Sequence, residues 1–224
     1  MSIENNIENI KNTVKLSLEK SGRTDDVNII AVTKTRTVQE INEVVKLGIT
    51  HLGENRVQEL VQKYDDVKGD VTWHLIGHLQ RNKVKYIADK VSMIHSVDTP
   101  DLLKEIDRQA KKHDRIIDVL IEVNVSGEES KSGISPSEVY DFMENAMHFE
   151  NIKVRGLMTM APLGAPEEEI RNVFSTLYKI SIDISEKKYD NISMDYLSMG
   201  MSNDFHIAIE EGSNMVRIGT ALFK

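Results

Sequence analysis

The strongest constraint on the fold is a regular alternation of short apolar runs with longer segments of helical periodicity. Runs rich in β-branched residues recur eight times in the 224 residues, and nearly every run precedes a segment with apolar residues every three to four positions. Such strands, separated by helices, are typical of parallel strands buried on both faces. Eight units predict one closed (β/α)8 barrel of the TIM-barrel type, spanning residues 1–224 as a single domain. The predicted strands are 27–34, 49–55, 71–77, 92–97, 117–124, 153–159, 193–200 and 215–219.

Helix start signals support the same count. Thr37, Thr99-Pro100 and Ser135-Pro136 each provide an N-cap residue, two of them followed by proline at the first helical position. An extra helix precedes the first strand, with an apolar stripe that begins at Ile3 and ends at Val14. The predicted helices cover residues 3–20, 37–47, 56–64, 81–88, 135–147, 167–187 and 204–210, and a further one begins at Thr99.

An open doubly wound sheet is the alternative architecture. It is the less favoured of the two, because no G-x-G-x-x-G motif follows the first predicted strand. No linker or low-complexity segment divides the chain, which favours one domain.

Composition narrows the class of partner. A formal net charge of -8 and a pI of about 5.4 argue against nucleic acid or an anionic membrane as a partner. The absence of cysteine excludes thiolate chemistry, and the seven histidines show no H-E-x-x-H spacing, so we expect no metal site. The polar N-terminus and the lack of a long apolar stretch predict a cytoplasmic protein, which we expect to be a monomer.

Polar and small residues gather where the predicted strands end, which is where barrel enzymes place their active centres. Lys34 ends the first strand after an apolar run, where desolvation would lower the pKa of its amine, as a Schiff-base lysine requires. The alternative is that Lys34 merely ends the strand and extends into solvent. The strand-end residues are Lys34, Glu54, Asn55, Gly77, His78, Ser96, Asp98, Asn124, Met158, Thr159, 198–202, Gly219 and Thr220.

The ends of the last two strands predict an anion site. The loop 198–204 contains glycine and serine before a short helix, and strand eight ends in Gly219-Thr220. Loops after strands seven and eight are the usual phosphate site of β/α barrels, although glycine and serine are also common in ordinary turns. Since strand one adjoins strand eight in a closed barrel, these features predict a phosphorylated carbonyl ligand within reach of Lys34.

Arg217 lies two residues before Gly219, so both share one face of strand eight. Its permanent charge in the barrel mouth would keep a pyridine nitrogen unprotonated. The alternative is an ion pair with a barrel carboxylate, either Asp195 or Glu122.

These residues lie in motifs that make the chain resemble the YggS/PROSC family of pyridoxal-phosphate-binding homeostasis proteins over nearly its full length. The barrel of that family is similar to the N-terminal barrel of alanine racemase and of type-III-fold amino-acid decarboxylases. The matching motifs are AVTKT (31–35), HLGENRVQE (51–59), WHLIGHLQRNK (73–83), SVD (96–98), EVNVSGEESKSG (122–133), RGLMTM (155–160), LSMGMSND (197–204) and VRIGTALF (216–223).

The resemblance implies that pyridoxal 5'-phosphate (PLP) is bound as a Schiff base on Lys34, with Arg217 at the pyridine nitrogen. It implies phosphate contacts from Ser202, Gly219 and Thr220. It also implies that Asn55, His78 and Met199 lie near the ring or at its rim. The segment 127–133 resembles a rim loop in which Lys131 either meets the phosphate or a partner, or is simply solvated.

The expected function is a non-enzymatic carrier or buffer of PLP in intracellular PLP homeostasis, with PLP-dependent apo-enzymes as recipients. Racemisation by the barrel relatives needs a second acid/base tyrosine, and no tyrosine lies in a motif at the functional rim. The alternatives are a slow or narrow-specificity PLP-dependent racemase or lyase, and an interaction protein for which PLP is only a signal.

Overall fold

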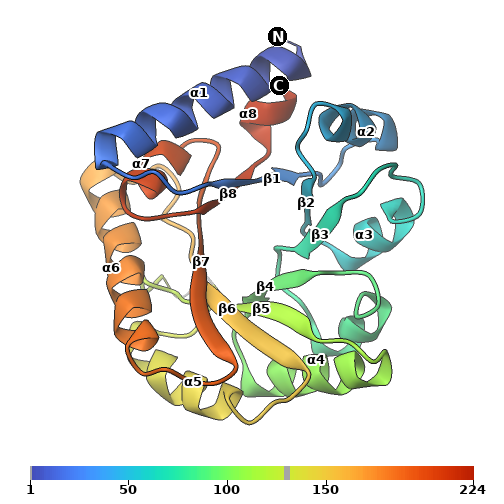
Figure 1. The fold of residues 1–224 in the computed structure, drawn as a ribbon, viewed down its shortest axis with the longest axis vertical. Coiled ribbons are helices and arrows are strands. Elements are labelled where there is room, and N and C mark those ends of the chain that lie inside the picture. Colours follow the sequence, from blue (N-terminus) through green and yellow to red (C-terminus); the bar gives the residue numbers. More distant parts are fainter. Residues whose placement is uncertain (1, 129–131) are drawn as a thin grey trace.

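The chain folds into a closed barrel of eight parallel strands surrounded by helices (Figure 1). The computed structural model describes residues 2–128 and 132–224. Each strand pairs with the next, and the last pairs with the first in parallel, with Ile30 opposite Arg217. The predicted barrel is therefore confirmed, and the open doubly wound sheet is wrong.

Most strands are shorter than predicted, because the residues at their ends leave the sheet to form the loops of the rim. The seventh strand is an exception and extends at both ends. The strands are β1 (Asn28–Val32), β2 (His51–Glu54), β3 (Thr72–Leu75), β4 (Met93–Val97), β5 (Ile117–Glu122), β6 (Ile152–Met158), β7 (Ile192–Met201) and β8 (Met215–Ile218).

Three helical segments begin at the predicted caps Thr37, Thr99 and Ser135, the last of them as a 3-10 turn that precedes α5. Thr37 and Thr99 accept hydrogen bonds from backbone N–H groups three residues on. The segment predicted over 81–88 is a 3-10 helix, whose spacing of three places Val84 and Ile87 together in the core. The helices are α1 (Ile3–Ser21), α2 (Val38–Lys46), α3 (Val57–Lys63), η1 (Arg81–Tyr86), α4 (Pro100–Lys112), η2 (Pro136–Glu138), α5 (Val139–Ala146), α6 (Glu167–Ser185), α7 (Phe205–Glu210) and α8 (Thr220–Phe223).

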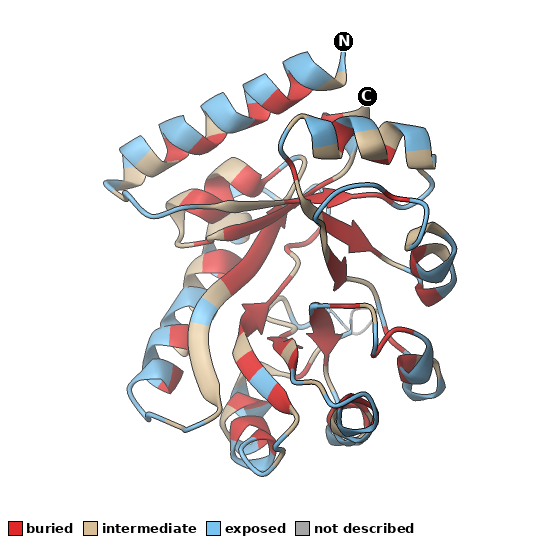
Figure 2. Cartoon of the chain, turned by 45° about the vertical axis from the view of Figure 1, so that its right-hand side comes forward, coloured by how far each residue is buried: buried red, intermediate tan, exposed pale blue. Residues whose placement is uncertain are grey.

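The core has two layers. The larger one lies between the strands and the helices, whose buried faces point toward the barrel (Figure 2). The smaller one fills the inside of the barrel with five buried side chains, so the barrel is a packed core and not a pore. These side chains are Ile30, Met93, Leu120, Met158 and Met215.

The extra N-terminal helix α1 packs against α7 and α8, beside the C-terminus (Figure 1). The buried side-chain amide of Asn6 donates to the carbonyl of Leu222 at 3.1 Å. The start of the chain is thereby tied to the last helix, which begins at the predicted phosphate site.

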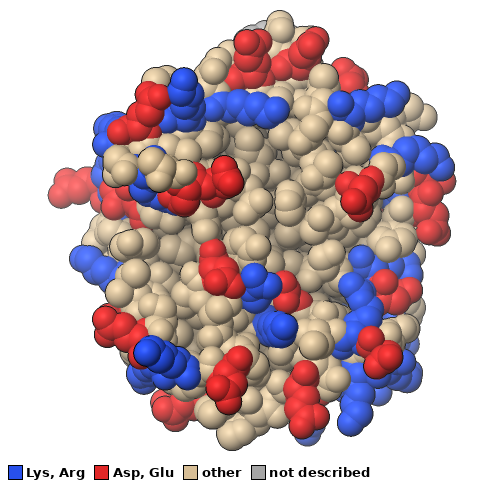
Figure 3. All heavy atoms as spheres, viewed as in Figure 1, with Lys and Arg blue, Asp and Glu red and all other residues tan. Residues whose placement is uncertain are grey.

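Acidic and basic side chains are interspersed on the face seen in Figure 3, without a continuous basic patch. Among the described helices, none is both long and apolar enough to cross a membrane.

Candidate functional site

Five of the eight predicted site residues line one cavity at the carboxyl ends of β1, β7 and β8. The cavity has a volume of about 440 Å³, within the usual range for small-molecule sites. Its wall is completed by the loop after β6, from Ala161 to Ala165. The five predicted residues are Lys34, Ser202, Arg217, Gly219 and Thr220.

Lys34 lies just beyond β1 and is exposed at this cavity. The expectation of a dry environment for its amine is wrong, because β1 ends at Val32 and the turn that follows carries the side chain into the open mouth. The next residue, Thr35, adopts a left-handed conformation with φ of 60°, and its N–H donates to Glu59 at 2.9 Å. This bond fixes the turn on which Lys34 sits.

A buried ion pair supports the same turn from behind. The carboxylate of Glu54, fully buried at the end of β2, accepts hydrogen bonds of 2.7 Å from the Thr33 hydroxyl and from the Lys63 amine. Lys63 also donates to the Thr33 carbonyl at 2.8 Å. Burial raises the pKa of Glu54, while the bonds from Lys63 and Thr33 oppose that rise. The residue before Lys34 is therefore tied to both β2 and α3.

Ser202 joins the loop after β7 to the start of α8. Its hydroxyl oxygen accepts N–H bonds from Gly219 at 3.3 Å and from Ala221 at 3.1 Å. A β-carbon at Gly219 would lie 3.3 Å from the Val32 β-carbon, so the small residue allows this close approach. The Ser202 hydroxyl and the two N–H groups that donate to it therefore lie close together in the cavity that Lys34 lines.

Arg217 is 4% exposed and lies inside the barrel. One terminal nitrogen donates to both the carbonyl and the hydroxyl of Ser198 at 2.7 Å, and the other donates to the Thr159 carbonyl at 3.0 Å. Burial lowers the pKa of Arg217 to about 10, so the guanidinium stays charged at neutral pH. Its Nε–H makes no hydrogen bond with residues 2–128 and 132–224, and Arg217 is among the residues that line the cavity. That donor is available to a ligand.

The alternative pairing of Arg217 is wrong. Asp195 is bound by Arg155 at 2.7 Å, and Glu122 forms no ion pair with Arg217. Glu122 is 3% exposed, and its carboxyl forms no hydrogen bond with the described residues. Burial, with a smaller contribution from repulsion by Asp98, raises the pKa of Glu122 to about 7.

Three predicted site residues lie outside the cavity. Asn55 follows β2, and its backbone lies close to Gly77. A β-carbon added to Gly77 would lie 2.4 Å from the Asn55 carbonyl oxygen. His78 is exposed and lines a neighbouring hollow with Asp98. Met199 is fully buried in the layer between strands and helices, while Met201 lines the cavity. The predicted contact of Lys131 falls outside the described residues.

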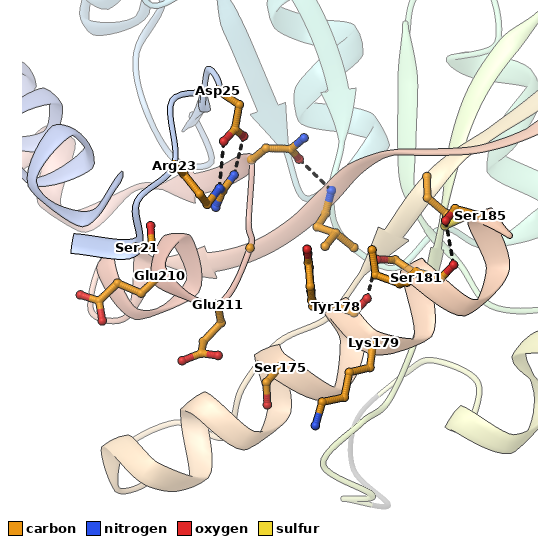
Figure 4. A pocket seen from close by; sticks show the side chains of 15 residues that line it. Ser21, Arg23, Asp25, Ser175, Tyr178, Lys179, Ser181, Ser185, Glu210 and Glu211 are labelled. Carbon is orange, nitrogen blue, oxygen red and sulfur yellow. Dashed lines mark hydrogen bonds and ion pairs between the residues drawn. The ribbon is translucent and has the colours of Figure 1, made fainter. Parts of the chain in front are cut away.

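A larger groove lies near the opposite end of the barrel, between α6, α7 and the segment before β1 (Figure 4). Asp25 and Asn214 in its wall both precede strands, and this end of a β/α barrel serves stability. Its polar groups bond to one another: Arg23 to Asp25 at 2.9 Å, and the Ser181 hydroxyl to the Tyr178 carbonyl at 2.7 Å. We therefore place the candidate site at Lys34.

Sequence reasoning placed Glu54 and Ser198 at strand ends but gave them no partner, and it missed Lys63 on α3 altogether. Their roles depend on contacts between distant elements, which no local pattern marks. His51 and His74, within β2 and β3, bond to each other at 3.0 Å, and only His74 is fully buried.

The fold and the site define a barrel protein with an exposed lysine just after the first strand, beside a rim of hydroxyl and backbone N–H groups after the last two. The family model for the alanine racemase N-terminal domain matches residues 2–224. A pyridoxal phosphate homeostasis protein of Aquifex aeolicus is 42% identical over 212 residues, which is 94% of this chain and 92% of that protein. The chain belongs to the pyridoxal phosphate homeostasis protein family, as its motifs predicted.

Solved structures agree with this assignment. PipY of Synechococcus elongatus PCC7942, whose structure is described as having PLP bound, superposes with a TM-score of 0.87 at 30% identity over the full length of both chains. An alanine racemase of Clostridium difficile 630 has a TM-score of 0.72 at 16% identity, covering 94% of this chain and 56% of that one. The second likeness shows the shared fold alone.

Proposed function

We propose that this chain binds PLP covalently through the Lys34 amine and acts as a carrier or buffer in PLP homeostasis. The observation that carries the proposal is the convergence of Lys34, Ser202, Arg217 and Gly219-Thr220 on one cavity. These residues come from β1, β7 and β8, so their meeting is a property of the closed barrel.

The residues fit the chemical groups of PLP. The Ser202 hydroxyl and the N–H groups around Gly219 would hold the phosphate, with Thr220 at the rim. The unpartnered Nε–H of Arg217 would donate to the pyridine nitrogen and keep it unprotonated, because guanidinium does not give up its proton at neutral pH. Asn55, His78 and Met199 stay as proposed neighbours of the ring or its rim.

These features support a carrier better than an enzyme. When bound, PLP supplies an aldehyde carbon that amines attack. An arginine at the ring nitrogen weakens the electron sink on which most PLP catalysis depends. Among the described residues that line the cavity there is no tyrosine to act as a second acid/base. The exposed Lys34 would leave the attachment point accessible to amines and to recipient apo-enzymes, and we propose that this exchange takes place in the cytoplasm.

Borohydride trapping followed by peptide mass mapping tests the proposal. We expect a reduced pyridoxyl adduct on the peptide that contains Lys34, and none in a Lys34→Ala variant. A Lys46→Ala variant, at an exposed helical position, is the matched control and should label as wild type does. Label on another lysine, or no label on a folded protein, would contradict the proposal.

One observation favours a slow racemase or lyase as the second candidate. Glu122 is a buried carboxyl with a pKa of about 7 on the strand that ends opposite β1, which suits proton transfer at neutral pH. Amino acids incubated with the PLP-loaded protein in heavy water would reveal this activity. Sustained exchange of the α-proton of one amino acid, lost in Glu122→Gln, would favour the enzyme over the carrier.

A further inference from the structure

A chain of hydrogen bonds crosses the inside of the barrel and ends on Arg217. The Arg217 guanidinium donates to the Ser198 hydroxyl at 2.7 Å, and that hydroxyl bonds to Nδ1 of His95 at 2.9 Å. Nε2 of His95 bonds to Nδ1 of His74 at 3.0 Å, and Nε2 of His74 bonds to Nδ1 of His51 at 3.0 Å. Because β4 and β7 are not neighbours in the barrel, the bond between His95 and Ser198 spans its interior.

All members of the chain except the last are buried. Ser198 and His95 have no exposed surface and His74 is 1% exposed, whereas His51 is partly exposed. Burial lowers the pKa of His74 to about 3 and holds that of His95 well below its usual value. Both rings are therefore neutral at physiological pH, and each has one N–H donor and one acceptor nitrogen.

The charge of Arg217 sets the direction of the chain. A guanidinium donates and cannot accept, so the Ser198 oxygen presents a lone pair to Arg217 and its hydrogen must point elsewhere. Nδ1 of His95 is the remaining partner of this hydroxyl in the described part of the chain. If His95 instead donated from Nδ1 to the Ser198 oxygen, the Ser198 hydroxyl hydrogen would be buried without an acceptor. That would cost about 1–3 kcal/mol.

We propose that His95, His74 and His51 form a one-directional chain, each ring neutral with its hydrogen on Nε2, that positions Arg217 through Ser198. Each member donates to the next, from Arg217 to Ser198, His95, His74 and His51. The outermost Nε2–H, on His51, reaches the partly exposed end. In this arrangement one terminal nitrogen of Arg217 donates both of its hydrogens to Ser198. The Nε–H then remains for a ligand.

The inference rests on the proposed function only in one respect, the identity of the ligand that Arg217 meets. The direction of the chain is a property of the protein without ligand. The two are therefore tested separately.

Nitrogen NMR of histidine-labelled protein without PLP tests the direction. Two-bond proton–nitrogen correlations distinguish the two neutral tautomers and the imidazolium, and His→Gln variants assign the signals. We expect Nε2–H tautomers for His74 and His95 at neutral pH. An Nδ1–H tautomer or an imidazolium at either residue would overturn the proposed direction, whatever the result of borohydride trapping.

Substitution of His95 tests the positioning role. His95→Asn keeps an acceptor near the position of Nδ1, and we expect its PLP affinity to stay within about threefold of wild type. His95→Leu removes the acceptor, and we expect at least about tenfold weaker PLP binding, the effect of one disrupted hydrogen bond to a charged group. If His95→Leu does not fold, Ser198→Ala breaks the chain one step nearer to Arg217 and should weaken binding similarly. Wild-type affinity in a folded His95→Leu or Ser198→Ala variant would overturn the positioning role.

Discussion

Glu122 offers a direct test of the electrostatics of the barrel mouth through the variant Glu122→Gln. This residue is 3% exposed, and its carboxyl has no hydrogen-bond partner among the described residues. The folded protein therefore binds a proton at Glu122 over a pH range in which the unfolded chain has already released it. Stability due to Glu122 is complete below the unfolded pKa and is lost as the pH rises through the folded pKa.

The size of the effect follows from the two pKa values. The pKa of Glu122 rises from 4.5 to about 7 on folding. At about 1.4 kcal/mol for each pH unit between them, the wild type should lose about 3 kcal/mol of stability between pH 4.5 and pH 7 through this one group. Glutamine does not titrate. The free energy of unfolding of Glu122→Gln minus that of wild type should therefore be about 3 kcal/mol larger at pH 8 than at pH 4.5.

Urea unfolding followed by the fluorescence of the single tryptophan, Trp73, measures this difference, since Trp73 is buried in β3. Glu144→Gln, at an exposed position, is the control. Its free energy of unfolding should differ from that of wild type by the same amount at both pH values. Asp98→Asn should reduce the pH dependence, because Asp98 repels the charged form of Glu122. A difference between Glu122→Gln and wild type that does not change with pH would refute the reasoning.

Three further predictions concern the support of the site. Lys63→Met should cost about 3–5 kcal/mol in urea unfolding, because it leaves the buried Glu54 carboxylate without its cation; an unchanged midpoint would contradict this. Gly200→Ala should cost at least about 2 kcal/mol, because φ is +93° and the added β-carbon would lie 2.6 Å from that of Ala208; thermal unfolding measures it, and a melting temperature equal to wild type would show that the strand end can relax. Ser202→Ala should weaken PLP binding about tenfold with little change in fold, as judged by spectroscopic titration; unchanged affinity would place the phosphate elsewhere.

Much of the fold was predictable because it depends on local periodicity. Continuous β-branched runs predicted the strands, and capping residues such as Thr37 and Thr99 predicted where helices begin. Strand ends were less predictable, because a residue leaves the ladder when its neighbour on the next strand does. The short helix over Arg81–Tyr86 became a 3-10 helix for a related reason, since the packing of Val84 and Ile87 favours a spacing of three.

The candidate site was only partly predictable. The rule that barrel sites lie at the carboxyl ends of strands identified Lys34, Ser202 and Gly219 without any structure. The same rule does not say which strand-end side chains share a cavity, and His78 lines a different hollow. The exposure of Lys34 was predicted incorrectly, because it depends on the shape of the mouth and not on the apolar run that precedes the residue.

The sequence by itself determined the number of strands and their approximate positions along the chain, because these follow from patterns a few residues long. Only the tertiary structure decided the contacts across the barrel. Ser198 meets His95 from 103 positions away, and Glu54 meets Thr33 from 21. Such contacts depend on the register between strands and on the closure of the barrel. Register and closure are set by many small contributions to the folding free energy from the whole chain, so no single residue carries a local sequence signal for them.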